Sequence, residues 1–400
     1  MTIHRDNERV TRIQQALERA QLDAVACCFP SNVLLLSGYW PVIGSSIALA
    51  TRDGKIILIV PEDEKVLAKQ SWADEVRTFS GGSLEEIKKK AESARAPLVE
   101  IATSLNLFSN GKIGFESEDQ YQPCSYASMH SFAPIIKEMV EQASYGAKLV
   151  SADALISTLR TTLTPGEITR LRSACAIAEQ AYVVGKKNIR PDLKETELAN
   201  FFRTPLSVPE NENILRADGF VYCMSGPNAA DASAAYQWSR SRRLADGDFV
   251  LIHCNSYADG FWTDITRTYI LGKADDRKQN ILDALLEARD AALAKIKPSV
   301  KASEVDRAAR ETMKERGFGK EFKHPTGHGV GFAAINHSAP PMLHPKSTDV
   351  LEEGMVFNVE PGFYEEGFGG ARHCDMVLVT KTGAEVLTKF HDRTDELIII

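Results

Sequence analysis

Apolar and polar positions along the chain follow helical spacing in some segments and strand-like spacing in others. Over residues 7–21 apolar residues recur every three or four positions, which predicts an amphipathic helix. Residues 23–29 form a continuous apolar run, which is typical of a buried strand. Two further apolar runs flank Asp53-Gly54, a dipeptide that favours a tight turn, so we predict a β-hairpin there.

The pattern continues with a helix predicted near 83–104, the strand KIGFES, and a second helix near 125–143. Helices and strands therefore alternate through this part of the chain. We predict that residues 1–156 form one α/β domain.

A second region begins with a strong helix start signal. Thr164 can cap a helix, Pro165 suits its first turn and Glu167 completes a capping box, so a helix is predicted to run to about Asn188. A helix near 194–203, the strand GFVYCM and a group of further elements follow. These are strands at 248–256 and 260–271, helices near 275–296 and 302–316, and strands near 355–362 and 372–380. Strands and helices grouped in this way predict an α+β domain over residues 157–400.

Composition excludes several classes of protein. The 400 residues are 44% hydrophobic, which is enough for a large core, and the formal net charge is −7, so nucleic acid is not an expected partner. No segment reaches the ~18 apolar residues of a membrane span, and the polar N-terminus lacks a signal-peptide pattern, so we expect a cytoplasmic protein without membrane contact. The seven cysteines are odd in number and scattered, which favours reduced thiols. A small molecule or short peptide is the expected partner.

Candidate chemistry is concentrated in the last 150 residues. Asp259-Gly260 predicts a hairpin turn whose two arms can aim their side chains at one point. The glycine-rich segment HPTGHGVGF allows close backbone approach around an imidazole. Each of five segments contributes one side chain that could bind a metal, namely His253, Asp264, His328, Glu360 and Cys374.

The motifs DITRT, GHGVGF and VEPG, in this order, resemble the pita-bread metallopeptidase family, which includes prolidase, aminopeptidase P and the metal-free amidinohydrolase creatinase. The segments LLLSGYWPV and IVPEDE are similar to the creatinase-type N-terminal domain. The resemblance implies an α+β fold, in which a C-terminal pita-bread domain is preceded by an α/β N-terminal domain. It also implies hydrolysis of an amide or related C–N bond.

Peptidases of this family hold two divalent metals with two aspartates, one histidine and two glutamates. The resemblance assigns the second aspartate to Asp264, the histidine to His328 and the first glutamate to Glu360. The first aspartate normally stands eleven residues before the second, where this chain has His253. The second glutamate normally stands two residues after Arg372, where this chain has Cys374. We therefore expect an altered metal centre.

The two replacements leave several roles open. His253 could bind a metal or act as a general base. Cys374 could bind zinc or iron, fill the space of the lost carboxylate, or act as a nucleophile. One divalent metal, zinc or iron rather than a manganese or cobalt pair, is expected, and a metal-free centre stays open. Glu360, His253, His337 and Arg372 are the candidate catalytic residues.

Substrate contacts also depart from the family pattern. The loop DASAAY, which ends at Tyr236, lacks the histidine that family peptidases carry there, and Tyr236 is a candidate contact. A second catalytic histidine is expected where this chain has Ile335, and the nearest candidate is His337. In related enzymes the N-terminal domain often reaches the partner's active site. Tyr39 and Trp40 could therefore contact substrate across a homodimer, or pack locally in the core.

Three functions follow from these residues. The first is an Xaa-Pro dipeptidase-like hydrolase in which a metal assists the attack of water. The second is a metal-independent, creatinase-like hydrolase with His253 as the base for a small polar substrate. The third is a non-enzymatic binding protein that kept the pocket. We expect the first, because ligand-type residues stand at all five positions.

Overall fold

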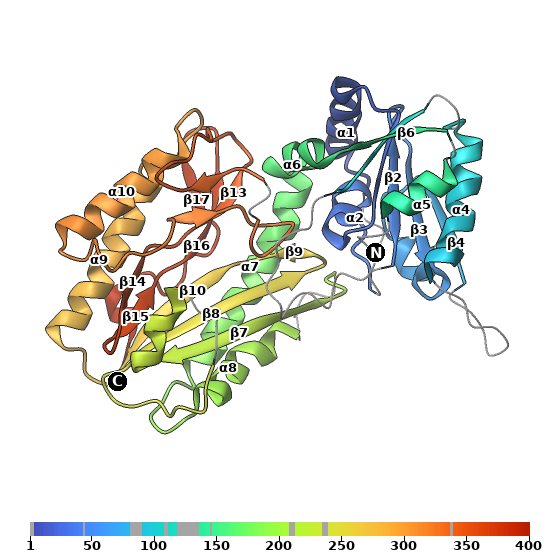
Figure 1. Ribbon diagram of the computed structural model, residues 1–400. Coiled ribbons are helices and arrows are strands. Elements are labelled where there is room, and N and C mark those ends of the chain that lie inside the picture. Colours follow the sequence, from blue (N-terminus) through green and yellow to red (C-terminus); the bar gives the residue numbers. More distant parts are fainter. Residues whose placement is uncertain are drawn as a thin grey trace. The chain divides into compact units, whose positions relative to one another are not determined.

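The computed structural model describes residues 4–42, 45–80, 90–107, 111–117, 136–144, 146–207, 213–233, 239–336 and 339–400. The chain divides into two compact units, Met1–Arg160 and Thr161–Ile400 (Figure 1). The division falls within helix α6 (Asp153–Thr161), and the predicted boundary between residues 156 and 157 lies in the same helix.

The first unit is built on one six-stranded sheet with the order β4-β3-β2-β1-β5-β6. Strands β1, β2 and β3 are antiparallel neighbours, and the remaining pairs are parallel. Gly54, at φ +89°, lies in the predicted turn between β2 and β3, which confirms the hairpin. The strands are β1 (Ala24–Cys27), β2 (Ile47–Thr51), β3 (Ile56–Pro61), β4 (Glu75–Phe79), β5 (Lys112–Phe115) and β6 (Lys148–Ser151).

Helix α1 (Asn7–Ala20) shows why the first sequence pattern predicted correctly. Asp6 caps its start by accepting a hydrogen bond from the amide of Arg9 at 2.9 Å. Its apolar residues Val10, Ile13 and Leu17 are buried. The other helices of this unit are α2 (Pro30–Ser37), α3 (Lys65–Ala68), α4 (Lys90–Ser104) and α5 (Ile136–Ala143). The predicted beginnings of α4 and α5, near residues 83 and 125, lie outside the described residues.

The second unit opens with helix α7 (Pro165–Lys186), and Thr164 and Glu167 form the predicted capping box. Helix α8 (Glu195–Arg203) and strand β7 (Ala217–Ser225) follow. The main sheet has the order β18-β10-β8-β7, with β9 paired to β8, and contains β8 (Phe249–Ala258), β9 (Phe261–Trp262), β10 (Ile265–Leu271) and β18 (Ile398–Ile399).

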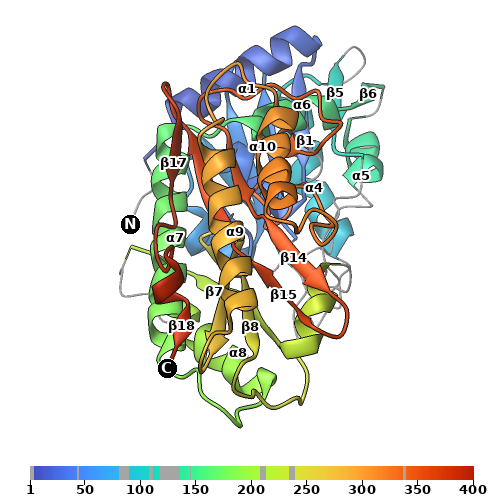
Figure 2. The same cartoon turned by 90° about the vertical axis from the view of Figure 1, so that its left-hand side faces the viewer.

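Helices α9 (Asp276–Leu293) and α10 (Ala302–Glu315) lie side by side over the short C-terminal strands (Figure 2). These strands are β11 (Gly327–His328), β12 (Met342–Leu343), β13 (Val356–Val359), β14 (Gly362–Glu365), β15 (Gly369–Arg372), β16 (Asp375–Val379) and β17 (Ala384–Val386). They form three small antiparallel groups, β11-β12, β13-β16-β17 and β14-β15.

The strands predicted near 355–362 and 372–380 are present as β13 and β16, but both are shorter than predicted. β13 ends before Glu360 and Pro361, and proline has no amide hydrogen to donate. β16 begins at Asp375, so Arg372 belongs to β15 instead. Glu360 and Cys374 therefore lie between strands, where side chains are free of strict strand alternation.

Candidate metal centre

The β8-β10 hairpin brings His253 and Asp264 together, as predicted. The turn at Asp259 and Gly260 has positive φ at both residues, +46° and +85°, which suits a tight hairpin. His253 pairs with Thr266 across the ladder, and Asp264 lies two residues before Thr266. The Nε2 of His253 is 3.7 Å from Oδ1 of Asp264.

The glycine-rich segment places His328 against the same aspartate. Gly327 allows the close approach, because an added Cβ would lie 1.9 Å from the carbonyl oxygen of Asn358. The Nε2 of His328 is 3.4 Å from Oδ2 of Asp264 and 3.7 Å from Oε1 of Glu360. One imidazole therefore lies between two carboxylates.

Asp264, His328 and Glu360 form a compact set of donors. One ligand atom from each lies within 4.8 Å of the others, and all three side chains are buried. Oδ1 of Asp264 is buried and has no hydrogen-bond partner among the residues that the structure describes. A buried carboxylate oxygen without a partner is energetically costly, so the arrangement fits a cation that would fill its coordination.

The electrostatics of this set also favour a cation. Burial would raise the pKa of Asp264, but the nearby His253, His328 and Arg372 outweigh it and the pKa is lowered, so this carboxylate stays ionised. Burial raises the pKa of Glu360 to about 7. Burial would lower the pKa of His328, yet its hydrogen bond to Asp264 and the charge of Glu360 raise it overall.

Asn358 is a residue of the centre that the sequence analysis missed. Its Oδ1 accepts a hydrogen bond from the amide of His328 at 2.7 Å, and its Nδ2 lies 3.3 Å from Oδ2 of Asp264 and 3.2 Å from Nε2 of His328. Asn358 lies on β13, two residues before the break at Glu360, and no motif of the sequence analysis singled it out.

His253 already has partners on both ring nitrogens. Its Nδ1 accepts a hydrogen bond from a guanidinium nitrogen of Arg372, which can only donate, and lies 3.0 Å from Oγ1 of Thr266. Its Nε2 therefore carries the proton and donates to Oδ1 of Asn255 at 2.8 Å. The Nδ2 of Asn255 faces the carbonyl oxygen of Thr263 at 3.5 Å, which supports this amide orientation. His253 borders the centre but turns no free lone pair toward it.

The pKa of His253 agrees with this neutral state. Burial lowers it to about 4, and the charge of Arg372 adds to the effect against the opposing charge of Asp264. A ring with this pKa is uncharged at neutral pH and is a weak general base.

Cys374 lies beside the centre as a protonated thiol. Its Sγ donates to the backbone carbonyl oxygen of Asp264 at 3.2 Å, and its side chain is fully buried. Burial, with the charges of Asp264 and Glu360, raises the pKa of Cys374 well above its usual value. A neutral thiol turned toward a carbonyl group is a poor nucleophile in this arrangement.

Arg372 connects the two sides of the centre. Its Nε donates to Oγ1 of Thr266 at 3.0 Å and lies 3.8 Å from Oε2 of Glu360. Despite burial, the carboxylates and Tyr364 hold the pKa of Arg372 above its ordinary value, so the guanidinium is cationic. The side chain of Arg372 thus contacts Glu360, Thr266 and His253.

The remaining candidates lie elsewhere or outside the described residues. Tyr39 and Trp40 are buried in the first unit, and the hydroxyl of Tyr39 donates to the carboxylate of Glu64. His337 and Tyr236 lie outside the described residues, so their predicted roles stay predictions.

The chain belongs to a known class of enzymes. Residues 169–381 match metallopeptidase family M24, so the chain is a member of that family, and residues 9–162 match the creatinase/prolidase N-terminal domain. These matches confirm the predicted family, the two-part fold and a hydrolase acting on C–N bonds. The family uses divalent metal, and the buried set of Asp264, His328 and Glu360 is a possible ligand group for it.

Individual relatives cover nearly the whole chain. An Xaa-Pro dipeptidase of Pyrococcus horikoshii is 29% identical over 388 residues, which are 96% of this chain and 97% of that protein. An Xaa-Pro dipeptidase of Pyrococcus furiosus is 29% identical over 390 residues, 96% of this chain and 98% of that protein. Among solved structures, the prolidase from Pyrococcus horikoshii has a TM-score of 0.75 at 28% identity, covering 96% of this chain and 98% of that one. An Xaa-Pro dipeptidase from Bacillus anthracis has a TM-score of 0.78 at 25% identity, covering 98% and 99%.

Among the described residues, every helix is too short or too polar to span a lipid bilayer. The predicted cytoplasmic location and homodimer stay predictions.

Proposed function

We propose that this protein is a peptidase that cleaves short peptides at an Xaa-Pro bond with the help of one divalent cation held by Asp264, His328 and Glu360. The observation that carries the proposal is the buried, unpartnered carboxylate oxygen of Asp264 within a set of three ligand-type side chains. The Xaa-Pro dipeptidases that match over 96% of the chain support the substrate class.

A cation bound there would polarise the carbonyl group of the substrate and acidify water. The chain's own residues prepare that position. Asp264 supplies a permanent negative charge, and the amide of Asn358 fixes the orientations of Asp264 and His328. Arg372 stays cationic 3.8 Å from Glu360 and favours its ionised form. Glu360 and His337 are proposed to move protons during the reaction.

The one-cation stoichiometry follows from the state of the two replaced positions. His253 uses both ring nitrogens within the protein, and Cys374 donates its thiol hydrogen to a carbonyl group. The described residues therefore offer one set of three ligands. Because this set contains no thiolate, the earlier preference for zinc or iron loses its main support, and the donor chemistry does not select one metal.

The alternative of a metal-independent hydrolase is not favoured. It requires His253 to take a proton from water, and this ring has a pKa of about 4 and both nitrogens bonded. The unpartnered oxygen of Asp264 likewise argues against a binding protein without a cation.

Hydrolysis of matched dipeptides tests the proposal. We expect the purified protein to release free proline from Ala-Pro and Leu-Pro, to act much more slowly on Ala-Ala, and to lose turnover after dialysis against a chelator. Readdition of a divalent metal should restore it. Equal rates on all three peptides would refute the substrate class, and full activity after complete metal removal would refute the cation.

A further inference from the structure

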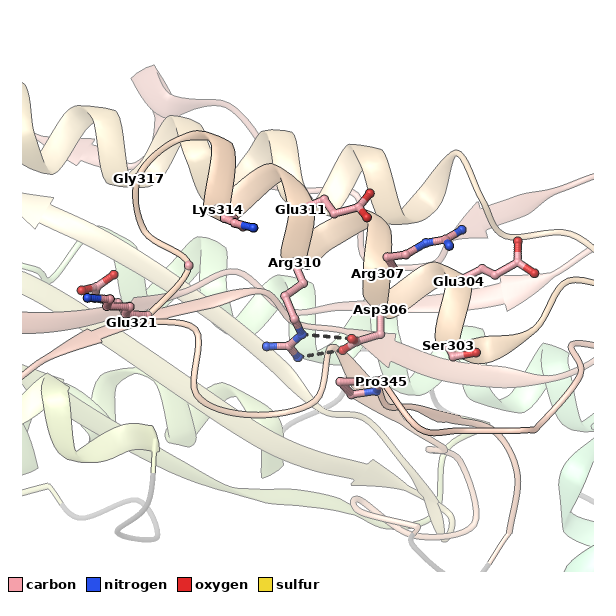
Figure 3. Close-up of a pocket in the computed structure, with 12 residues that line it drawn as sticks. Ser303, Glu304, Asp306, Arg307, Arg310, Glu311, Lys314, Gly317, Glu321 and Pro345 are labelled. Carbon is pink, nitrogen blue, oxygen red and sulfur yellow. Dashed lines mark hydrogen bonds and ion pairs between the residues drawn. The ribbon is translucent and has the colours of Figure 1, made fainter.

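Helix α10 lies outside the set of metal-ligand candidates, yet it carries a buried ion pair that bonds to the segment before His328. Asp306 is completely buried although the rest of the buried face of α10 is apolar. Its two carboxylate oxygens accept hydrogen bonds from Nε and Nη2 of Arg310 at 3.0 and 2.8 Å. Figure 3 shows this pair on the side of α10 that faces the strands, along a groove of about 1060 Å³. None of the three proposed ligands lines that groove.

The ion pair holds three alternate residues of the segment 322–326, which leads into the glycine-rich segment. Oδ1 of Asp306 accepts hydrogen bonds from the amide and the hydroxyl of Thr326, at 3.1 and 2.8 Å. Arg310 donates to the carbonyl oxygens of Phe322 and His324, at 3.2 and 3.0 Å. Its guanidinium also lies 4.4 Å from the centre of the Phe322 ring.

Thr326 connects this pair to two of the proposed ligands. It precedes His328 by two residues, and its carbonyl oxygen accepts the hydrogen bond of the Glu360 amide at 2.7 Å. Its hydroxyl donates to Asp306, and its amide is shared between Asp306 at 3.1 Å and the carbonyl oxygen of Leu343 at 2.9 Å. A shift of Thr326 would therefore displace His328 through the chain and Glu360 through the hydrogen bond.

We propose that Asp306 and Arg310 are positioning residues of the metal centre, which set the spacing between His328 and Glu360 by fixing Thr326. The inference rests on the proposed one-cation centre. A charged pair suits the task, because charge-assisted and bidentate hydrogen bonds restrict geometry more strongly than neutral bonds. Residues that orient metal ligands in this way typically change metal affinity by 10–100-fold when they are replaced.

The test measures binding of Co²⁺ to the metal-free, full-length protein by calorimetry and by the visible absorption of the bound ion. We expect Asp306→Ala to weaken binding at least about tenfold and to change the absorption spectrum. Asp306→Asn keeps an oxygen for Thr326, so it should recover most of that affinity. Thr326→Val, which keeps the size of the side chain and removes one hydrogen bond, should weaken binding by a smaller factor.

Asp248→Asn is the matched control. Asp248 pairs with Arg242 at the start of β8 and has no hydrogen bond to the segment 322–328. This variant should lose thermal stability and bind Co²⁺ as the wild-type protein does. If Asp306→Ala does not fold, Thr326→Val decides the question.

The positioning role and the one-cation centre can be refuted separately. Wild-type affinity and spectrum in Asp306→Ala and Thr326→Val would overturn the positioning role alone, and so would an equal loss of affinity in Asp248→Asn. Absence of Co²⁺ binding by the wild-type protein would overturn the one-cation centre and the positioning role together.

Discussion

On one side of the centre, Asp264, His328 and Glu360 converge, and a buried oxygen of Asp264 accepts no hydrogen bond from the described part of the chain. On the other side, His253 and Cys374 are equally buried, but each has its hydrogen bonds made within the protein. Both sides consist of residue types that bind metals. Residue type alone therefore does not identify a metal ligand here. Asp264 is distinguished by a buried oxygen to which no described residue donates a hydrogen bond.

The largest effect should come from replacing Asp264. Asp264→Asn removes the permanent charge of the centre, so we expect peptidase activity to fall at least about a thousandfold, since a bound cation contributes several kcal/mol to such reactions. Bound metal, measured by elemental analysis, should fall in parallel. Asp248→Asn serves again as the control, because it removes a carboxylate of the same unit that pairs with Arg242. Activity near the wild-type level in Asp264→Asn would show that Asp264 is not needed to hold the cation.

A double substitution tests the positions of His253 and Cys374. His253→Asp with Cys374→Glu replaces the two satisfied side chains by carboxylates, so we expect bound metal to rise from one to two ions per chain. Cys374→Ala alone should leave one ion, because the thiol bonds to the backbone of Asp264 and not to the ligand set. A count of two ions in the wild-type protein, or of one in the double variant, would contradict the assignment of the two sides.

A smaller effect is expected from pH. In the metal-free protein the pKa of Glu360 is about 7, above its ordinary value, so below pH 7 a proton must leave before the carboxylate can bind a cation. The affinity for Co²⁺ should therefore fall about tenfold between pH 8 and pH 6, measured by calorimetry. Affinity that is equal at both pH values would show that Glu360 is not a ligand.

The same shift has a consequence for stability. Because the folded pKa of Glu360 is raised, its contribution to the stability of the metal-free protein is fully present below the unfolded pKa and is lost as the pH rises through about 7. Bound metal should reverse this trend, because it stabilises the ionised carboxylate.

The sequence predicted the parts of the centre that local geometry determines. The turn at Asp259-Gly260 fixed the approach of His253 to Asp264, and Gly327 allowed His328 to approach β13. Asn255 was missed, although it stands two residues from His253 on the same face of β8. Asn358 was missed because Glu360, the nearest predicted residue, lies beyond the end of β13.

The bonding state of His253 could not be predicted in the same way. It depends on Arg372, which lies 119 residues away along the chain, and no local pattern specifies that contact. The exact ends of the strands beside Glu360 and Cys374 were not predicted, because the ladders change partners there. Partner choice between distant strands is a tertiary property, and periodicity alone does not carry it.

Elemental analysis of the full-length protein, purified without added metal and assayed before and after chelation, tests the central claim most directly. We expect close to one divalent metal ion per chain. Peptidase activity should be lost on chelation and regained when one equivalent of metal is returned. Two ions per chain, or full activity in protein without metal, would contradict this claim.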